Sequence, residues 1–230
     1  MSKGMPLRPP APDSGPRFRP AVLFEALLLY CILFLPGALR GEPLPELAVF
    51  SINRELMRII AYNLPALALI WYLWRRNRPF PLPSLGDLFA FLWAFPFLIL
   101  TSLSVSMAAA RFPGQPQGFK TGAPSGIAGL AVMLFSCLST GYLEESYFRY
   151  YLGEKIRETG LASWVFMLIS VTLFGLCHLY EGPWGMMNSM LAALILGLIY
   201  IRFRCLHGLA LAHGFYNAVV YLASLGTQTP

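Results

Sequence analysis

Two adjacent glutamates, Glu144 and Glu145, lie in a stretch of chain that is otherwise almost wholly apolar. A carboxylate buried in a membrane costs several kcal/mol unless it is paired or hydrogen-bonded, so such a residue marks a functional site by default. On a helix, Glu145 and Arg149 have the spacing and order that favour an ion pair, whereas Glu144 points about 100° away. We therefore expect Glu145 and Arg149 to pair and Glu144 to face a cavity. The alternative is a helix end at the membrane surface, where water solvates the charges.

Two further polar motifs follow toward the C-terminus. Phe174 and His178 are four residues apart, so we expect the phenyl ring to pack beside the imidazole. His213 and Asn217 have the same spacing and place two donors on one helix face, where they can stabilise an oxyanion. The alternative for both motifs is ordinary hydrogen bonding between membrane helices. His207, at a basic turn, is predicted to be a solvated loop residue.

The composition indicates a polytopic membrane protein with an all-α fold. Apolar residues make up 57% of the chain and charged residues only 12%, about half the charged fraction of a soluble domain. Crossing a hydrocarbon core takes about 20 apolar residues. On that basis we predict a transmembrane helix bundle of about seven spans, near 21–39, 56–74, 88–110, 127–147, 161–179, 188–203 and 206–224.

The chain divides into three parts. Residues 1–20 are predicted to be a disordered, basic and proline-rich cytoplasmic tail, 21–126 the front transmembrane helices, and 127–225 the catalytic core. The front helices are expected to serve as packing and as a wall facing the substrate. No internal repeat is visible, and transporters usually show one, which disfavours a transport or proton-relay protein.

The net charge of +6 follows the loops and does not indicate nucleic-acid binding. Loops rich in Lys and Arg alternate with poorer ones, which predicts an integral, multi-pass protein with a cytoplasmic N-terminus and a basic surface against the lipid bilayer. The four cysteines are scattered in or beside apolar runs, so no disulfide framework is expected. The aromatic group Tyr147, Phe148, Tyr150 and Tyr151 is predicted to lie at the membrane–water boundary.

Taken together and in order, the three motifs resemble the CPBP family of intramembrane proteases, also called the CAAX-protease and bacteriocin-processing or Abi family. Its members include the Ras-converting CAAX prenyl endopeptidase and lysostaphin resistance protein A-like proteins. The family pattern reads EExxxR, then FxxxH, then HxxxN, on successive transmembrane helices. This chain matches every motif position between about 130 and 220, whereas residues 1–126 offer no such match.

The resemblance implies an endopeptidase that cleaves a membrane-associated protein or peptide inside the bilayer. Glu144 resembles the general base that activates a water, with His178 as its partner, and His213 and Asn217 resemble the oxyanion site. The supporting residues, structural or substrate-orienting, are Glu145, Arg149 and Phe174. The substrate is expected to be a C-terminal tail, either prenylated or of the sorting-signal or bacteriocin type. The short chain favours a prokaryotic relative in the inner membrane.

Family members have also been described as metalloproteases, and zinc held by Glu144, His178 and His213 would leave an open fourth position. The chain has no H-E-x-x-H motif, however, and a glutamate that binds zinc cannot also act as the base. We therefore prefer a mechanism without metal or other cofactor, with the zinc enzyme as the alternative. A non-catalytic membrane immunity protein is a further alternative.

One geometric expectation follows from the predicted spans. His178 lies about 25 Å into its helix and His213 about 10 Å into the last one, at 1.5 Å per residue. Straight, untilted helices would keep the two imidazoles apart. Either the helices tilt or break, or the predicted limits of the spans are wrong.

Overall fold

The computed structural model describes residues 20–39, 50–75, 81–112 and 122–225, and every element in these ranges is a helix. This confirms the predicted all-α fold. The predicted N-terminal tail lies outside the described residues, except for Pro20, which begins the first helix.

The first half of the chain forms α1 (Pro20–Leu33), α2 (Leu35–Ala38), α3 (Ile52–Arg58), η2 (Ile59–Asn63), α4 (Leu64–Arg75) and α5 (Leu85–Ala109). Helices α3 and α4 are continuous through η2, a π-helical turn, and we call Ile52–Arg75 the front helix. Pro65 follows this turn. A proline lacks its N–H and crowds the carbonyl four residues earlier, and the wider π turn accommodates both effects.

The second half forms α6 (Gly126–Glu145), η3 (Ser146–Tyr151), α7 (Leu152–Glu158), α8 (Ser163–Leu176), η4 (Leu179–Glu181), α9 (Gly182–Phe203) and α10 (His207–Ala223). Helices α6 and α7 are joined through the π-helical turn η3 into one long helix, Gly126–Glu158, which we call the central helix.

Within the described residues, four helices are long and apolar enough to cross a membrane: Ile52–Arg75, Leu85–Ala109, Gly126–Glu158 and Leu179–Phe203. The predicted count of seven is therefore not confirmed. Helices α1 and α8 have 14 residues each, which gives about 21 Å and falls short of a hydrocarbon core of about 30 Å. Helix α10 has 17 residues and is not among the four long spans.

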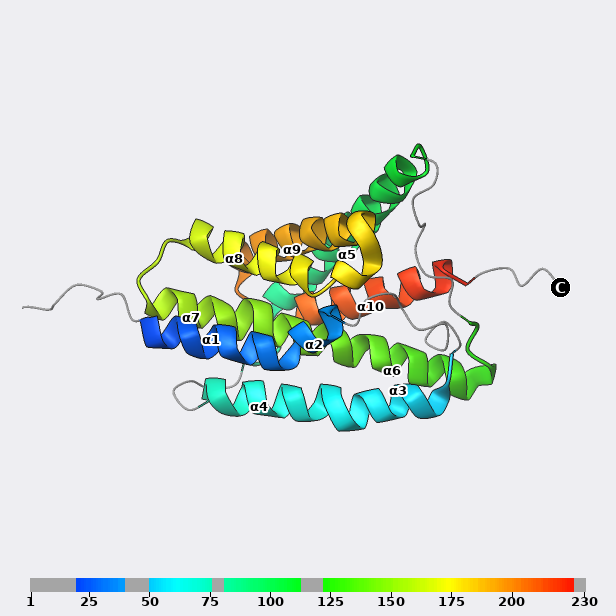
Figure 1. Ribbon diagram of the computed structural model, residues 1–230, viewed down its shortest axis with the longest axis horizontal. Coiled ribbons are helices and arrows are strands. Elements are labelled where there is room, and N and C mark those ends of the chain that lie inside the picture. Colours follow the sequence, from blue (N-terminus) through cyan, green and yellow to red (C-terminus); the bar gives the residue numbers. More distant parts are fainter. Residues whose placement is uncertain (1–19, 40–49, 76–80, 113–121, 226–230) are drawn as a thin grey trace, which may run out of the picture.

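The front helix, the central helix and α9 run along the longest axis of the molecule, whereas α5 crosses it obliquely (Figure 1). The central helix has the front helix on one side and α10 on another. Helix α10 also packs on α5, and α9 packs on both α5 and α8. The central helix and α10 are therefore direct neighbours, although they are far apart in the sequence.

Glycines allow the central helix and α10 to touch through their backbones. A methyl group added at Gly141 would lie 2.7 Å from the carbonyl oxygen of Ala210 and 2.7 Å from the amide nitrogen of Gly214. One added at Gly214 would lie 2.8 Å from the Cα of Leu138. Small residues at such a crossing are typical of membrane helix pairs. Gly141 is one turn before the paired glutamates and Gly214 is next to His213, so this crossing brings the motifs together.

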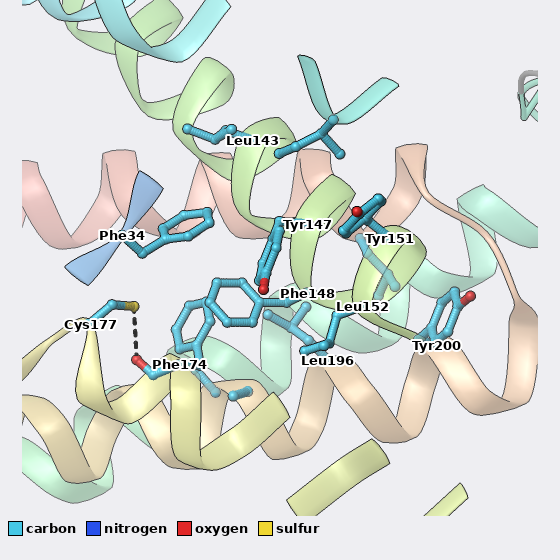
Figure 2. Packing of buried hydrophobic residues seen from close by; sticks show 14 of the residues in the cluster. Phe34, Leu143, Tyr147, Phe148, Tyr151, Leu152, Phe174, Cys177, Leu196 and Tyr200 are labelled. Carbon is cyan, nitrogen blue, oxygen red and sulfur yellow. Dashed lines mark hydrogen bonds between the residues drawn. The ribbon is translucent and has the colours of Figure 1, made fainter. Parts of the chain in front are cut away.

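An aromatic cluster fills the space between the central helix, α8 and the chain around Phe34 (Figure 2). Tyr147, Phe148 and Tyr151 are 0%, 0% and 1% exposed, so these rings pack inside the bundle, and their predicted place at the membrane–water boundary stays a prediction. The π turn directs them inward, where Phe148 meets the ring of Phe174 edge-on at 4.9 Å. This cluster holds η3 against α8.

Polar contacts also join the front helix to the central helix. They form three groups along the interface: Ser136 with Glu55 and Arg58, then Asn63 with Ser139 at 2.7 Å and Thr140 at 3.1 Å, then Trp71 with Ser146 at 3.1 Å. Hydrogen bonds between side chains help membrane helices to associate. The front helix is therefore more than an apolar wall, because it fixes the central helix on both sides of the glutamates.

Candidate active site

The π turn η3 begins directly after the two glutamates. Such turns insert an extra residue into an α-helix and occur frequently at functional sites. Glu144 to Arg149 were expected to lie on a regular α-helix, so the π turn was not predicted. Its effect is local: Arg149 and the buried aromatic residues lie within the turn, while Glu144 and Glu145 end the regular helix before it.

The predicted ion pair between Glu145 and Arg149 is present and fully buried. Arg149 Nε lies 3.1 Å from Glu145 Oε2, and both side chains are 0% exposed. Arg149 Nη2 also donates to the carbonyl oxygen of Ala193 on α9 at 3.2 Å. The rings of Phe148 and Phe174 lie 5.9 and 5.2 Å from the guanidinium. A buried charge needs such partners, because nothing else replaces its lost hydration.

His213 links both glutamates to α10. Its Nδ1 lies 2.9 Å from Glu145 Oε1, and its Nε2 lies 3.4 Å from Glu144 Oε2. From the sequence, Glu144 and Glu145 were expected to point in different directions around the helix. The imidazole of His213 nevertheless contacts both carboxylates. Glu145 therefore has two partners, Arg149 on one oxygen and His213 on the other.

Glu144 remains the more accessible carboxylate of the pair. Its side chain is 12% exposed, against 0% for Glu145. Among the described residues its Oε2 has no hydrogen-bond partner, and its contact with His213 is longer than an ordinary hydrogen bond. This oxygen is itself buried, and its nearest charged neighbour is His213, whereas the Glu145 oxygens lie against both Arg149 and His213.

His178 lies just beyond the end of α8, stacked on Phe174. The ring centroids are 4.7 Å apart with an interplanar angle of 26°, so the expected contact is present. The Nδ1 of His178 lies 2.8 Å from the Phe174 carbonyl oxygen. Because a carbonyl can only accept, Nδ1 carries the proton and Nε2 has the lone pair. His178 is thereby oriented with a basic nitrogen directed away from its own helix.

Phe174 lies between the imidazoles of His178 and His213 and contacts both. Its ring is 4.7 Å from that of His178 and 5.8 Å from that of His213. Helix α8 ends at Leu176, two residues before His178, so His178 is not the continuation of a straight span. The predicted span 161–179 therefore ends earlier than expected, and its predicted limit was wrong.

Asn217 is placed one turn after His213 on α10 and is half-buried. The structure gives it no hydrogen bond to another described residue, so its amide is not engaged. The neighbouring Tyr216 is buried, with its ring 6.4 Å from that of His213. Its hydroxyl accepts a 2.7 Å hydrogen bond from Nδ2 of Asn188 on α9. Asn188 was not foreseen, although an amide in an apolar helix is the signal that would have found it.

His207 is bound between two segments, so its prediction as a solvated loop residue was wrong. Its Nε2 lies 3.0 Å from the Pro81 carbonyl oxygen and its Nδ1 lies 3.3 Å from the Tyr142 hydroxyl. The next residue, Gly208, donates its backbone N–H to Asp87 at 2.8 Å. These contacts fasten the start of α10 to the start of α5 and to the central helix. These contacts hold the N-terminal end of the helix that carries His213, and none of them involves His213 itself.

The predicted zinc ligands do not form a ready metal site. Among the residues that the structure describes, no three His, Cys, Asp or Glu side chains are placed to hold one metal ion. His213 already directs Nδ1 at Glu145, and the nearest carboxylate to its Nε2 is Glu144. We therefore describe no step through zinc.

Comparison with family models matched residues 125–219 to the family described as Type II CAAX prenyl endopeptidase Rce1-like. The matched segment begins just before α6 and ends within α10, so it contains all the motif residues from Glu144 to Asn217. Neither the curated proteins nor the solved structures compared with the chain gave a match.

Proposed function

We propose that the chain hydrolyses a peptide bond inside the membrane with a glutamate-activated water, a proposal that the match of residues 125–219 to the type II CAAX prenyl endopeptidase Rce1-like family supports. One observation carries the proposal. His213 on α10 contacts both glutamates of the central helix, at 3.4 Å from Glu144 and 2.9 Å from Glu145. This places an acid–base pair and a buried counter-charge at one point of an apolar helix bundle.

The proposed mechanism uses His213 as a hydrogen-bond donor through both ring nitrogens, and the charges around it support this role. Glu144 and Glu145 bring two negative charges and Arg149 one positive charge, so a neutral His213 would leave a net negative charge in a buried site. With both ring nitrogens protonated, His213 balances the four groups. Its Nδ1–H then donates to Glu145 and its Nε2–H faces the reaction centre beside Glu144.

The proposed reaction needs no covalent intermediate with the enzyme. Glu144 removes a proton from a water that His178 Nε2 orients, and the oxygen attacks the peptide carbonyl carbon. His213 Nε2–H and the amide of Asn217 stabilise the oxyanion that forms. Glu144 then returns its proton to the leaving amine as the C–N bond breaks. Glu145, Arg149 and Phe174 support these groups without touching the substrate.

The substrate that we propose is a membrane-associated protein or peptide cleaved near its C-terminus. The family description supports a prenylated tail, and a sorting-signal or bacteriocin-type tail presents the same chemistry, an extended peptide next to an apolar anchor. We place the protein in the inner membrane of a prokaryotic cell with its N-terminus in the cytoplasm. The zinc-dependent version of the same protease is the alternative, and metal analysis of purified active protein separates the two: stoichiometric zinc would overturn the metal-free mechanism.

The test of the base is Glu144→Gln, assayed with a membrane-tethered peptide reporter in proteoliposomes. General-base catalysis is worth about 10²–10⁴-fold, so we expect at least a hundredfold loss of cleavage with folded protein retained. Glu158→Gln is the matched control, because Glu158 is exposed at the end of α7 and the change in charge is the same. Full activity of the Glu144→Gln protein would refute the assignment.

A further inference from the structure

A groove of about 540 Å³ runs between α5 and α9 on the outer face of the bundle. Trp93 and Phe97 form its α5 wall, and Ile195, Leu198 and Ile199 form its α9 wall. Trp93, Phe97 and Leu198 are 54%, 45% and 55% exposed, so the groove opens toward the surroundings of the bundle. Its size lies within the range of small-molecule sites. None of the proposed catalytic residues lines it.

One cation stands among the apolar residues of this groove. Arg202 lies near the end of α9, is exposed, and has its guanidinium 5.2 Å from the ring of Phe203. In the part of the chain that the structure describes, no carboxylate forms an ion pair with it. Arg202 is about 10 Å along α9 from Ile195 at 1.5 Å per residue. The groove is therefore an apolar channel with a positive charge at one end.

That end of the bundle has the features of a membrane–water interface. Arg157 and Arg204 line one recess beside Tyr200, and Arg204 lies over the Tyr200 ring at 5.3 Å. The rings of Trp74 and Tyr150 meet edge to face with centroids 5.5 Å apart, and Trp74 directly precedes Arg75 at the end of α4. Amphipathic aromatic rings and basic side chains gather at the level of lipid headgroups. Arg202 is thus at headgroup level, while Ile195 lies deeper in the hydrocarbon.

We propose that the groove binds an anionic phospholipid, with one acyl chain along the walls from α5 and α9 and the phosphate at Arg202. Basic pockets between membrane helices are known to hold anionic headgroups. A prenyl chain would fill the walls equally well but brings no counter-charge for Arg202, and the phosphate of a zwitterionic lipid is already balanced by the cation of its own headgroup. The charge at the end of the groove therefore selects the anionic lipid over both.

The position of the groove gives the bound lipid a structural role. Helix α5 packs on α9 through one face and on α10, which carries His213 and Asn217, through another. A lipid in the groove would fill space on the outer side of the α5–α9 contact and hold the two helices together behind α10. This inference does not depend on the proposed peptidase activity, because lipid binding is measured without a substrate.

The experiment uses the full chain in phosphatidylcholine nanodiscs and follows quenching of Trp93 by brominated lipids. The Trp93 signal is obtained by subtracting the fluorescence of a Trp93→Phe variant. We expect brominated phosphatidylglycerol to half-quench Trp93 at about a fivefold lower mole fraction than brominated phosphatidylcholine, the factor that one basic residue gives at an anionic surface. Arg202→Gln should abolish this difference. Arg75→Gln, with the same change of charge at the end of α4, should retain it.

Equal quenching by the two lipids in the unmodified chain would overturn the proposal, and this comparison needs no variant. Loss of the difference in Arg75→Gln as well as in Arg202→Gln would also overturn it, because it would reduce the effect to general surface charge. Displacement of brominated phosphatidylglycerol by a farnesylated peptide at equal mole fraction would assign the groove to the substrate's prenyl chain instead. Thermal unfolding of each variant confirms that the comparison concerns folded protein.

Discussion

His213 and Glu145 are joined by a 2.9 Å contact between Nδ1 and Oε1, and both side chains are buried. The other Glu145 oxygen holds Arg149 at 3.1 Å. Glu145 therefore stands between two groups that come from different helices, and it is the residue through which the central helix orients the imidazole of α10. The predictions below test this arrangement and the contacts around it.

Arg149→Ala should strongly destabilise the fold, since it leaves Glu145 buried without its cation. Removing one partner of a buried pair costs about 3–5 kcal/mol. The control is Arg157→Ala, which breaks a solvent-exposed i,i+3 pair with Glu154 on the same central helix and should cost less than about 1 kcal/mol. Unfolding of the purified protein in mixed micelles measures both. Similar stability of the two variants would show that the buried pair is not needed.

His213→Gln and His207→Gln should separate catalysis from structure. The first removes the imidazole that contacts both glutamates and should lower kcat by about 10²–10³-fold, the usual effect of losing an oxyanion donor. The second breaks the contacts to Pro81 and Tyr142 and should lower stability by about 1 kcal/mol with little change in kcat. Cleavage kinetics and unfolding are measured on the same samples. Retained kcat in His213→Gln would remove His213 from the mechanism.

Gly208→Ala should be severely destabilising, because the added methyl group would lie 1.9 Å from the backbone oxygen of Asp87. The start of α10 has to move away from α5, and overpacking of this kind typically costs about 1–3 kcal/mol. Gly37→Ala is the control, since nothing lies within 4 Å of its added methyl group. A Gly208→Ala protein as stable as Gly37→Ala would contradict the close approach of α5 and α10.

Asn63→Leu should loosen the front helix from the central helix. Its amide donates to Ser139 and Thr140 from a 2% exposed position, and hydrogen bonds between membrane helices contribute about 0.6–1.7 kcal/mol. Ser104→Ala is the control, because that hydroxyl only bonds back to Leu100 within its own exposed helix. Unfolding gives the difference in stability. If both variants behave alike, the polar contacts do not hold the two helices together.

Contacts within one or two helical turns could be predicted from the sequence, because helical geometry fixes which side chains meet. The Glu145–Arg149 pair and the Phe174–His178 stack are of this kind, and both are present. The family match over residues 125–219 agrees with the resemblance carried by the three motifs. The roles of the individual residues remain predictions for the variants above.

Features that depend on distant parts of the chain could not be predicted. Apolar length alone does not say where a helix ends, and α8 ends at Leu176 because the chain turns there, with Gly182 at φ 77° beyond it. The bonds from Asn63 to the central helix cross more than 70 residues of sequence. The contacts of His207 likewise join three segments, so local charge gave the wrong expectation.

The backbone contact between Gly141 and Gly214 has a consequence for how the molecule handles its substrate. Two helices that touch through their main chains have no slack in which to slide, so Glu144 and His213 meet before any peptide arrives. Because the two side chains are already aligned, no binding energy from the peptide is needed to bring them together. For the proposed peptidase reaction we therefore expect entry of the peptide into the bilayer to be the slow step, and we expect variants that speed turnover to lie where the peptide enters rather than at Glu144 and His213.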